Sequence, residues 1–187
     1  MPPGRSPAAT AASSARATRR GDDGRLLEIG GLRLLVGSAG VGEAVRVGRL
    51  LVGNAGVLLT EVLYLKPGEV RNFCIVDAAM NDLMRPAMYE AWMRIEPCTE
   101  RDAPARCWDV VGPVCESGDW LARDRLLAVQ PGDLLAVTSA GAYGMAMSSN
   151  YNTRGRAAEV MVDGGRAFLV REREQPAQLF AGESRLP

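Results

Sequence analysis

The sequence predicts an all-β domain, a β-sandwich or Greek-key barrel-like fold, preceded by a disordered N-terminal tail. From about Leu50 onward, short apolar runs recur and each ends at a turn signal, a spacing typical of such folds. Apolar residues at the 3.6-residue spacing of an amphipathic helix are scarce over the same stretch. The first 24 residues are mainly Ala, Ser, Pro and Arg, which are too polar and small to form a core.

The apolar runs give the expected strands in order. They are Val57–Leu65, Phe73–Val76, Ala87–Ile95, Cys107–Val114, Asp133–Ser139, Ala142–Met147, Ala157–Val162 and Ala167–Arg171. Between them lie the turn sequences of residues 66–69, 130–133 and 163–165, in which Pro presets φ and Gly accepts positive φ. The last of these, Asp163-Gly164-Gly165, predicts a β-hairpin, and residues 175–180 predict one terminal helical turn.

These patterns divide the chain into four parts. Residues 1–24 are the expected disordered tail, and residues 25–48 an irregular or short-strand segment rich in glycine. Residues 49–175 form the expected β domain, and residues 176–187 a C-terminal tail.

Composition excludes several classes of function. Basic and acidic residues both number 22, so the formal net charge is zero, which argues against a nucleic-acid partner. No apolar run approaches the roughly 18 residues of a membrane-spanning helix, so no membrane partner is expected. Cytoplasmic localisation follows as the expectation, with an organelle as the alternative that the Arg-, Ala- and Ser-rich N-terminus raises.

Three residue types limit the available chemistry. The sequence has no His, which excludes Ser-His-Asp and Cys-His catalysis and His-based metal sites within it. Its four cysteines form no CxxC pair, so we expect reduced thiols and no metal site. Among the basic residues, 21 are Arg, and Lys66 is the only lysine.

Three clusters place reactive or charged side chains where turns are expected: residues 77–89, 112–119 and 139–152. Each has a structural explanation, such as a turn cap, a surface acid or a β-bulge. In combination they favour a binding site. A Cys115 thiol can act as general acid, the Glu116 carboxylate can bind an ammonium group, and Arg85 can bind a carboxylate. Tyr143, set between glycines, can approach a phosphate. These receptors together describe a site for an amino acid and a phosphorylated cofactor.

The same clusters resemble the C-terminal half of the diaminopimelate decarboxylase family. The resemblance runs from about Arg49 to Gly164 and keeps the order of the family's motifs. The matching strings are Val76-Asp77-Ala78-Ala79-Met80-Asn81-Asp82-Leu83-Met84-Arg85-Pro86-Ala87-Met88-Tyr89, Val111-Gly112-Pro113-Val114-Cys115-Glu116-Ser117-Gly118-Asp119, Ala140-Gly141-Ala142-Tyr143-Gly144 and Met147-Ser148-Ser149-Asn150-Tyr151-Asn152.

The resemblance implies conversion of meso-diaminopimelate to L-lysine and carbon dioxide with pyridoxal 5'-phosphate (PLP). It also implies an N-terminal α/β barrel, a C-terminal β domain and an active site shared by two chains at a dimer interface. Cys115 matches the proton donor, and Glu116 a substrate-binding acid supplied across that interface. Arg85 and Tyr89 match residues that bind the distal end of the substrate, and Tyr143 matches a contact to cofactor and substrate.

The sequence departs from the family pattern in two places. The family's Glu-Pro-Gly-Arg motif, which binds the PLP phosphate and the substrate, here reads Arg46-Val47-Gly48-Arg49, so only Gly48 and Arg49 match. The 48 residues before Arg49 are too few for an α/β barrel of about 250 residues, and Lys66 matches no catalytic position.

We therefore expect a fragment of a decarboxylase that is inactive alone, derived from a truncated or mispredicted gene. The alternative is a non-catalytic β module that associates with a full-length decarboxylase. In either case the partner is a homodimer-type interface or a full-length decarboxylase, and the detached β domain is expected to expose an apolar face.

Overall fold

The computed structural model describes residues 16–19, 24–29, 32–37 and 49–186, and the chain divides into two units at Arg49 and Leu50. In the first unit, β1 (Arg16–Arg19), β2 (Gly24–Ile29) and β3 (Leu32–Gly37) form an antiparallel sheet in that order. Strand β1 lies within residues 1–24, for which disorder is expected, and its backbone pairs with β2. The remainder of that tail lies outside the described residues, so the division into four parts stays a prediction.

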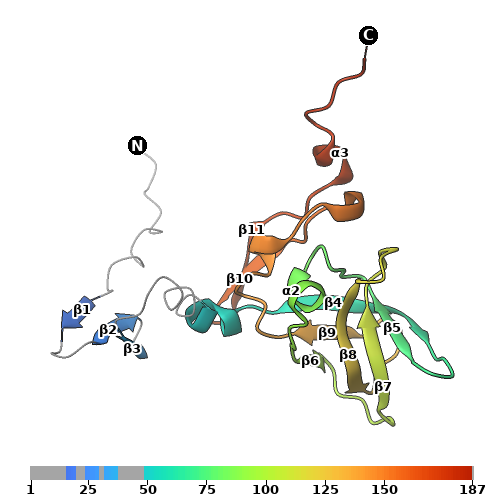
Figure 1. Ribbon diagram of the computed structural model, residues 1–187, viewed down its shortest axis with the longest axis horizontal. Coiled ribbons are helices and arrows are strands. Elements are labelled where there is room, and N and C mark those ends of the chain that lie inside the picture. The colour runs from blue at the N-terminus through green and yellow to red at the C-terminus, as the bar shows by residue number, and fades with distance from the viewer. Residues whose placement is uncertain (1–15, 20–23, 30–31, 38–48, 187) are drawn as a thin grey trace, which may run out of the picture. The chain divides into compact units, whose positions relative to one another are not determined.

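The second unit is built on a six-stranded sheet, shown in Figure 1. Its strands are β4 (Leu58–Lys66), β5 (Phe73–Val76), β6 (Ile95–Pro97), β7 (Arg106–Val111), β8 (Trp120–Leu127) and β9 (Leu134–Val137). They follow the spatial order β6-β9-β4-β5-β7-β8, and only the pair β5 and β7 is parallel among the neighbours of this sheet. The edge strands β6 and β8 also contact each other, so the sheet is nearly closed, and the predicted barrel-like β fold is confirmed.

The core fills the inside of this sheet. Alternate residues of the strands point inward, as in β5, where Cys74 and Val76 are fully buried between half-buried neighbours. Trp108 is buried on β7, and its indole nitrogen donates to the Leu127 carbonyl at 3.2 Å, so its one polar atom is satisfied. The opposite face of β5, β7 and β8 points out of the barrel.

Two of the predicted strands are wrong. Residues 87–95 divide between helix α2 (Met84–Tyr89) and a segment that leads into β6, since Pro86 lies in the first helical turn, where its missing N–H costs nothing. Residues 142–147 form a tight turn and the 3-10 helix η2 (Met145–Met147). Conversely, β8 was not predicted, because Arg123-Asp124-Arg125 interrupts its apolar pattern.

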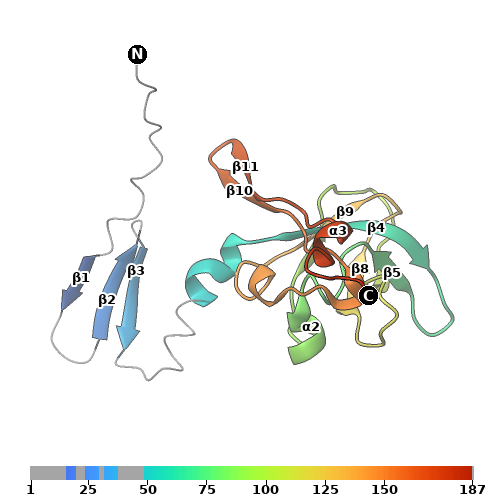
Figure 2. The ribbon, with the colours of Figure 1, turned by 90° about the horizontal axis from the view of Figure 1, so that it is seen from above.

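The C-terminal part confirms two local predictions. Strands β10 (Glu159–Asp163) and β11 (Arg166–Arg171) form the expected hairpin, whose turn places Gly164 at φ 57°. Helix α3 (Pro176–Leu179) is the expected helical turn, and Gln175 and Gln178 cap it reciprocally. Figure 2 shows the hairpin standing apart from the six-stranded sheet. Two further 3-10 turns are η1 (Gly53–Ala55) and η3 (Tyr151–Thr153).

Within the described ranges, no helix combines the length and the hydrophobicity needed to cross a bilayer.

Candidate functional site

A buried carboxylate joins the loop that carries Cys115 to the loop before α2. Asp119 is 5% exposed, and its Oδ1 accepts the Met80 N–H at 2.6 Å while its Oδ2 accepts the Val114 N–H at 2.7 Å. The backbone N–H of Asp119 also donates to the Glu116 carbonyl at 3.0 Å. Because both carboxylate oxygens are used by backbone donors, the acid is satisfied without a cationic partner. Two of the three clusters predicted from sequence therefore meet at Asp119.

Gly112 makes this meeting possible. A Cβ atom at Gly112 would lie 2.6 Å from Asp119 Oδ1 and 2.7 Å from the Ala79 Cα, closer than real Cβ contacts allow. Both neighbours belong to the same junction, so neither can move without breaking a hydrogen bond. Any side chain at this position forces the two loops apart.

A second junction ties the third cluster to the first. Asn81 is fully buried, and its Nδ2 donates to the Ser149 carbonyl at 3.2 Å while its carbonyl accepts the Ser149 N–H at 2.9 Å. Arg154 Nε donates to Asn81 Oδ1 at 3.0 Å, and Arg154 Nη2 donates to the Asp77 carbonyl at 2.6 Å. Burial raises the pKa of Asp82, and Arg154, 3.6 Å away, opposes that rise. All three clusters thus belong to one hydrogen-bonded assembly.

The assembly presents a thiol, an acid and a phenol to solvent. Cys115 is exposed, and Glu116 beside it accepts the Gly118 N–H on Oε1 and the Tyr151 hydroxyl on Oε2, both at 3.3 Å. Two hydrogen bonds lower the pKa of Glu116: the one from the Gly118 N–H has the larger effect, and the one from the Tyr151 hydroxyl the smaller. This carboxylate is therefore charged at neutral pH. The charge of Glu116 raises the pKa of Tyr151, and Cys115 contributes to the same rise. The anionic group needed to bind an ammonium is therefore present next to the thiol.

Arg85 and Tyr89 lie on α2, which directly follows the loop held by Asp119. Arg85 is half-buried and Tyr89 is exposed. In the part of the chain that the structure describes, neither side chain makes a hydrogen bond or an ion pair, so no such contact links Arg85 or Tyr89 to Cys115 or Glu116. Their cationic and phenolic groups are consequently available to a ligand.

Tyr143 has an unusual backbone conformation, with φ at 59° in the left-handed region. Such a conformation costs a non-glycine residue about 1–3 kcal/mol, and strain of this kind concentrates at functional sites. The approach of the Tyr143 hydroxyl to a phosphate stays a prediction, and the structure gives Gly141, two positions before Tyr143, a packing role. A Cβ at Gly141 would collide with the Val52 carbonyl and lie 2.7 Å from the Gly56 nitrogen, so this glycine permits close backbone packing.

The roles expected for Gly48 and Arg49 stay predictions. Gly48 lies outside the described residues, and Arg49 belongs to the other unit, at the start of the helical residues 49–52. Lys66 is exposed at the end of β4, pairs with Phe73 in the ladder and precedes the Pro67 turn. No group of three or more His, Cys, Asp and Glu side chains among the described residues could hold a metal ion.

Sequence reasoning missed the residues that hold the site together. Asp119 and Asn81 lie inside the predicted clusters but received no role, and Arg154 and Tyr151 received none either. The sequence signal for Asp119 is an acid that directly follows a glycine in an expected turn. The contact between Asn81 and Arg154 spans 73 positions and has no local signal.

Comparison with known proteins agrees with the motifs. Residues 14–141 match the family model described as the pyridoxal-dependent decarboxylase C-terminal sheet domain. A diaminopimelate decarboxylase of Pseudomonas fluorescens is 66% identical over 140 residues, which are 75% of this chain and 34% of that protein. The corresponding protein of Vibrio cholerae is 59% identical over 140 residues, again 75% and 34% of the two chains. This chain therefore spans about a third of the length of the curated relatives that it matches.

Solved structures show the same β domain. Diaminopimelate decarboxylase from M. jannaschii, in complex with L-lysine, matches 74% of this chain and 32% of its own with a TM-score of 0.72 and 44% identity. The Helicobacter pylori enzyme, also complexed with L-lysine, matches 71% of this chain and 33% of its own with a TM-score of 0.66 and 40% identity.

We predict that Gly112→Ala destabilises the β domain by about 1–3 kcal/mol, because the added Cβ overpacks the Asp119 junction. Thermal unfolding followed by circular dichroism measures the change. Gly182→Ala is the matched control, because nothing lies within 4 Å of its Cβ position. Equal melting temperatures for the two variants would contradict the proposed crowding at Gly112.

We also predict that Tyr151→Phe raises the pKa of Glu116 toward its ordinary value, because a hydrogen bond to the carboxylate is lost. The rise is partial, since the larger contribution from Gly118 remains. Carboxyl carbon NMR measures the titration, and Tyr64→Phe on the exposed part of β4 is the control. An unchanged Glu116 titration in Tyr151→Phe would exclude the hydrogen bond.

Proposed function

The chain belongs to the family of the pyridoxal-dependent decarboxylase C-terminal sheet domain, and we propose that it forms one wall of a diaminopimelate decarboxylase site. The reaction is the conversion of meso-diaminopimelate to L-lysine and carbon dioxide, in the cytoplasm. The observation that carries the proposal is the exposed Cys115 thiol beside the charged Glu116, which Tyr151 and Gly118 hold in place. The L-lysine named with two of the similar structures supports the substrate class.

Each predicted residue then has a chemical role. Cys115 donates its thiol proton to the substrate carbon that loses carbon dioxide, and Glu116 binds a substrate ammonium group. Arg85 binds the distal carboxylate, and Tyr89 contacts the same end of the substrate. Tyr143 contacts both substrate and cofactor, while Arg49 and Gly48 contribute to phosphate and substrate binding. The exposed or half-buried positions of Cys115, Glu116 and Arg85 support these roles.

PLP, when bound, supplies the electron sink for decarboxylation. The described residues fit the substrate-facing side of a PLP site, because they provide an acid, a proton donor and a free guanidinium. They do not fit the side that holds the cofactor covalently, since Lys66 is the only lysine and lies on an exposed strand end. The Schiff-base lysine therefore comes from another polypeptide segment, through a homodimer-type interface or a full-length decarboxylase, and this chain is inactive alone.

The hairpin β10–β11 favours a second candidate function. Its apolar side chains are exposed, among them Val162 at 70% and Leu169 at 60%. A surface of this kind fits a non-catalytic β module that binds a full-length decarboxylase and regulates it.

A reconstitution experiment tests the proposal. The purified chain mixed with PLP gives no Schiff-base absorbance and no decarboxylation, and adding the barrel part of the Pseudomonas relative, prepared without its C-terminal sheet domain, restores decarboxylation. A Schiff-base band from this chain alone would overturn the assignment of the lysine to another segment. Inhibition of a full-length relative without any reconstitution would favour the regulatory module.

In the reconstituted enzyme, we predict that Cys115→Ala lowers kcat by about 100-fold or more while PLP binding is retained, because only proton donation is lost. Cys98→Ala is the matched control, since Cys98 is also an exposed free thiol. Steady-state decarboxylation with PLP absorbance measures both effects. Equal kcat values for the two variants would exclude Cys115 as the proton donor.

A further inference from the structure

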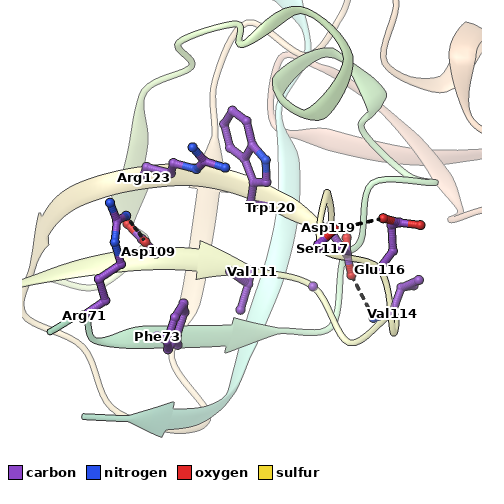
Figure 3. A pocket seen from close by; sticks show the side chains of 11 residues that line it. Arg71, Phe73, Asp109, Val111, Val114, Glu116, Ser117, Asp119, Trp120 and Arg123 are labelled. Carbon is purple, nitrogen blue, oxygen red and sulfur yellow. Dashed lines mark hydrogen bonds and ion pairs between the residues drawn. The ribbon is translucent and has the colours of Figure 1, made fainter. Parts of the chain in front are cut away.

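A groove of about 430 Å³ crosses the outward face of strands β5, β7 and β8 and ends at the Glu116 loop. Figure 3 shows Arg71 and Glu116 on opposite sides of this groove, with Val111, Trp120 and Arg123 between them. None of the roles given above to Cys115, Arg85 or Tyr143 uses the groove, because these residues do not line it. The groove therefore offers a site that shares only Glu116 with the proposed active site.

The first end of the groove is cationic. Arg71 Nη1 donates to Asp109 Oδ2 at 2.7 Å, but the guanidinium is half-exposed and keeps further N–H donors for a ligand. The Arg123 guanidinium carbon lies 4.2 Å from the centroid of the Trp120 ring, and Arg123 makes no ion pair within the described ranges. The stacked ring holds the Arg123 guanidinium over Trp120. Asp109 and Asp124 both act on Arg71, so the exposed Arg123 guanidinium, which has no ion-pair partner among the described residues, is the group at this end that attracts a carboxylate.

The second end is anionic. Glu116 lies at the rim as a charged carboxylate, and Ser117 lies beside it. Asp119 also lines this end, but it is buried and its oxygens accept backbone N–H groups, whereas the Glu116 carboxylate is exposed to a ligand. An ammonium group fits this end of the groove.

An apolar floor separates the two ends. Phe73, Val111 and Trp120 are half-buried on the three neighbouring strands, and Val111 pairs with Trp120 in the ladder. The Arg123 guanidinium covers the Trp120 ring, so Phe73 and Val111 supply the apolar surface that stays open between the two ends. A ligand that satisfies both ends therefore carries an aliphatic segment between its two charges.

We propose that this groove binds an ω-amino acid, a zwitterion whose carboxylate meets Arg71 and Arg123 and whose ammonium meets Glu116 across the apolar floor. Because Glu116 is also the proposed substrate contact, an occupied groove withdraws that carboxylate from the reaction. This regulatory consequence rests on the proposed function, whereas binding itself does not.

Isothermal titration calorimetry of the full chain without PLP tests the proposal with three probes of matched chain length. We expect saturable binding of 6-aminohexanoate, and affinities about 10-fold or more lower for hexanoate and for hexylamine, because each lacks one charge-assisted contact. Arg123→Gln lowers the affinity for 6-aminohexanoate by about 10-fold or more. Arg106→Gln is the matched control, since exposed Arg106 on the same sheet does not line this groove.

Three results would overturn the proposal: absence of saturable 6-aminohexanoate binding, equal binding of hexanoate, or equal affinities of the two arginine variants. Failure here leaves the proposed function intact, because the titration contains neither cofactor nor barrel. Failure of reconstitution with retained 6-aminohexanoate binding would instead remove only the link between the groove and decarboxylation.

Discussion

The two hydrogen bonds accepted by the buried Asp119 carboxylate fix the geometry on which the candidate site depends. One comes from Met80 in the loop before α2 and the other from Val114 in the loop before Cys115. Removing this acceptor would leave two backbone donors unsatisfied, each at a cost of about 1–3 kcal/mol. The identity of Gly112 follows from the same constraint, because the carboxylate occupies the space of a side chain there. A structural acid thus positions the exposed Cys115 thiol without contacting it.

The site combines a rigid support with exposed chemistry. Asn81 is buried and Asp82 half-buried, whereas Cys115, Glu116 and Tyr89 are exposed. A closed active site excludes water, which strengthens the electrostatic interactions inside it. The exposed groups of this site need a second surface over them to exclude water in the same way. A rigid but open arrangement is what one wall of a shared site requires. The lysine content of the sequence agrees with such an arrangement, because its only lysine lies on an exposed strand end.

The sequence predicted those features that depend on local pattern. Strands with continuous apolar runs, such as β5, and the Gly164 hairpin were found because their signals lie within a few residues. Strand β8 was not predicted because charged residues at its centre interrupt the apolar pattern. Part of helix α2, which has Pro86 in its first turn, was predicted as a strand. The three clusters were identified, but the contacts that unite them were not. Asn81 and Arg154, or Met80 and Asp119, are far apart in the chain, and no periodicity reports such pairs.

The hairpin β10–β11 extends the argument for association. Val160 and Val162 alternate with Met161, so they share one face with Leu169 and Ala167, and that face carries no charge. The opposite face carries the ion pair of Glu159 with Arg171 and the Arg166 guanidinium over Phe168, 5.3 Å from the ring centroid. The charged face is well solvated by water. The exposed aliphatic face, on a two-stranded hairpin, buries little apolar area and so adds little to the free energy of folding. Burial of the aliphatic face against another surface would therefore stabilise the hairpin most. The hairpin and the open site both favour a chain that acts when bound to another polypeptide.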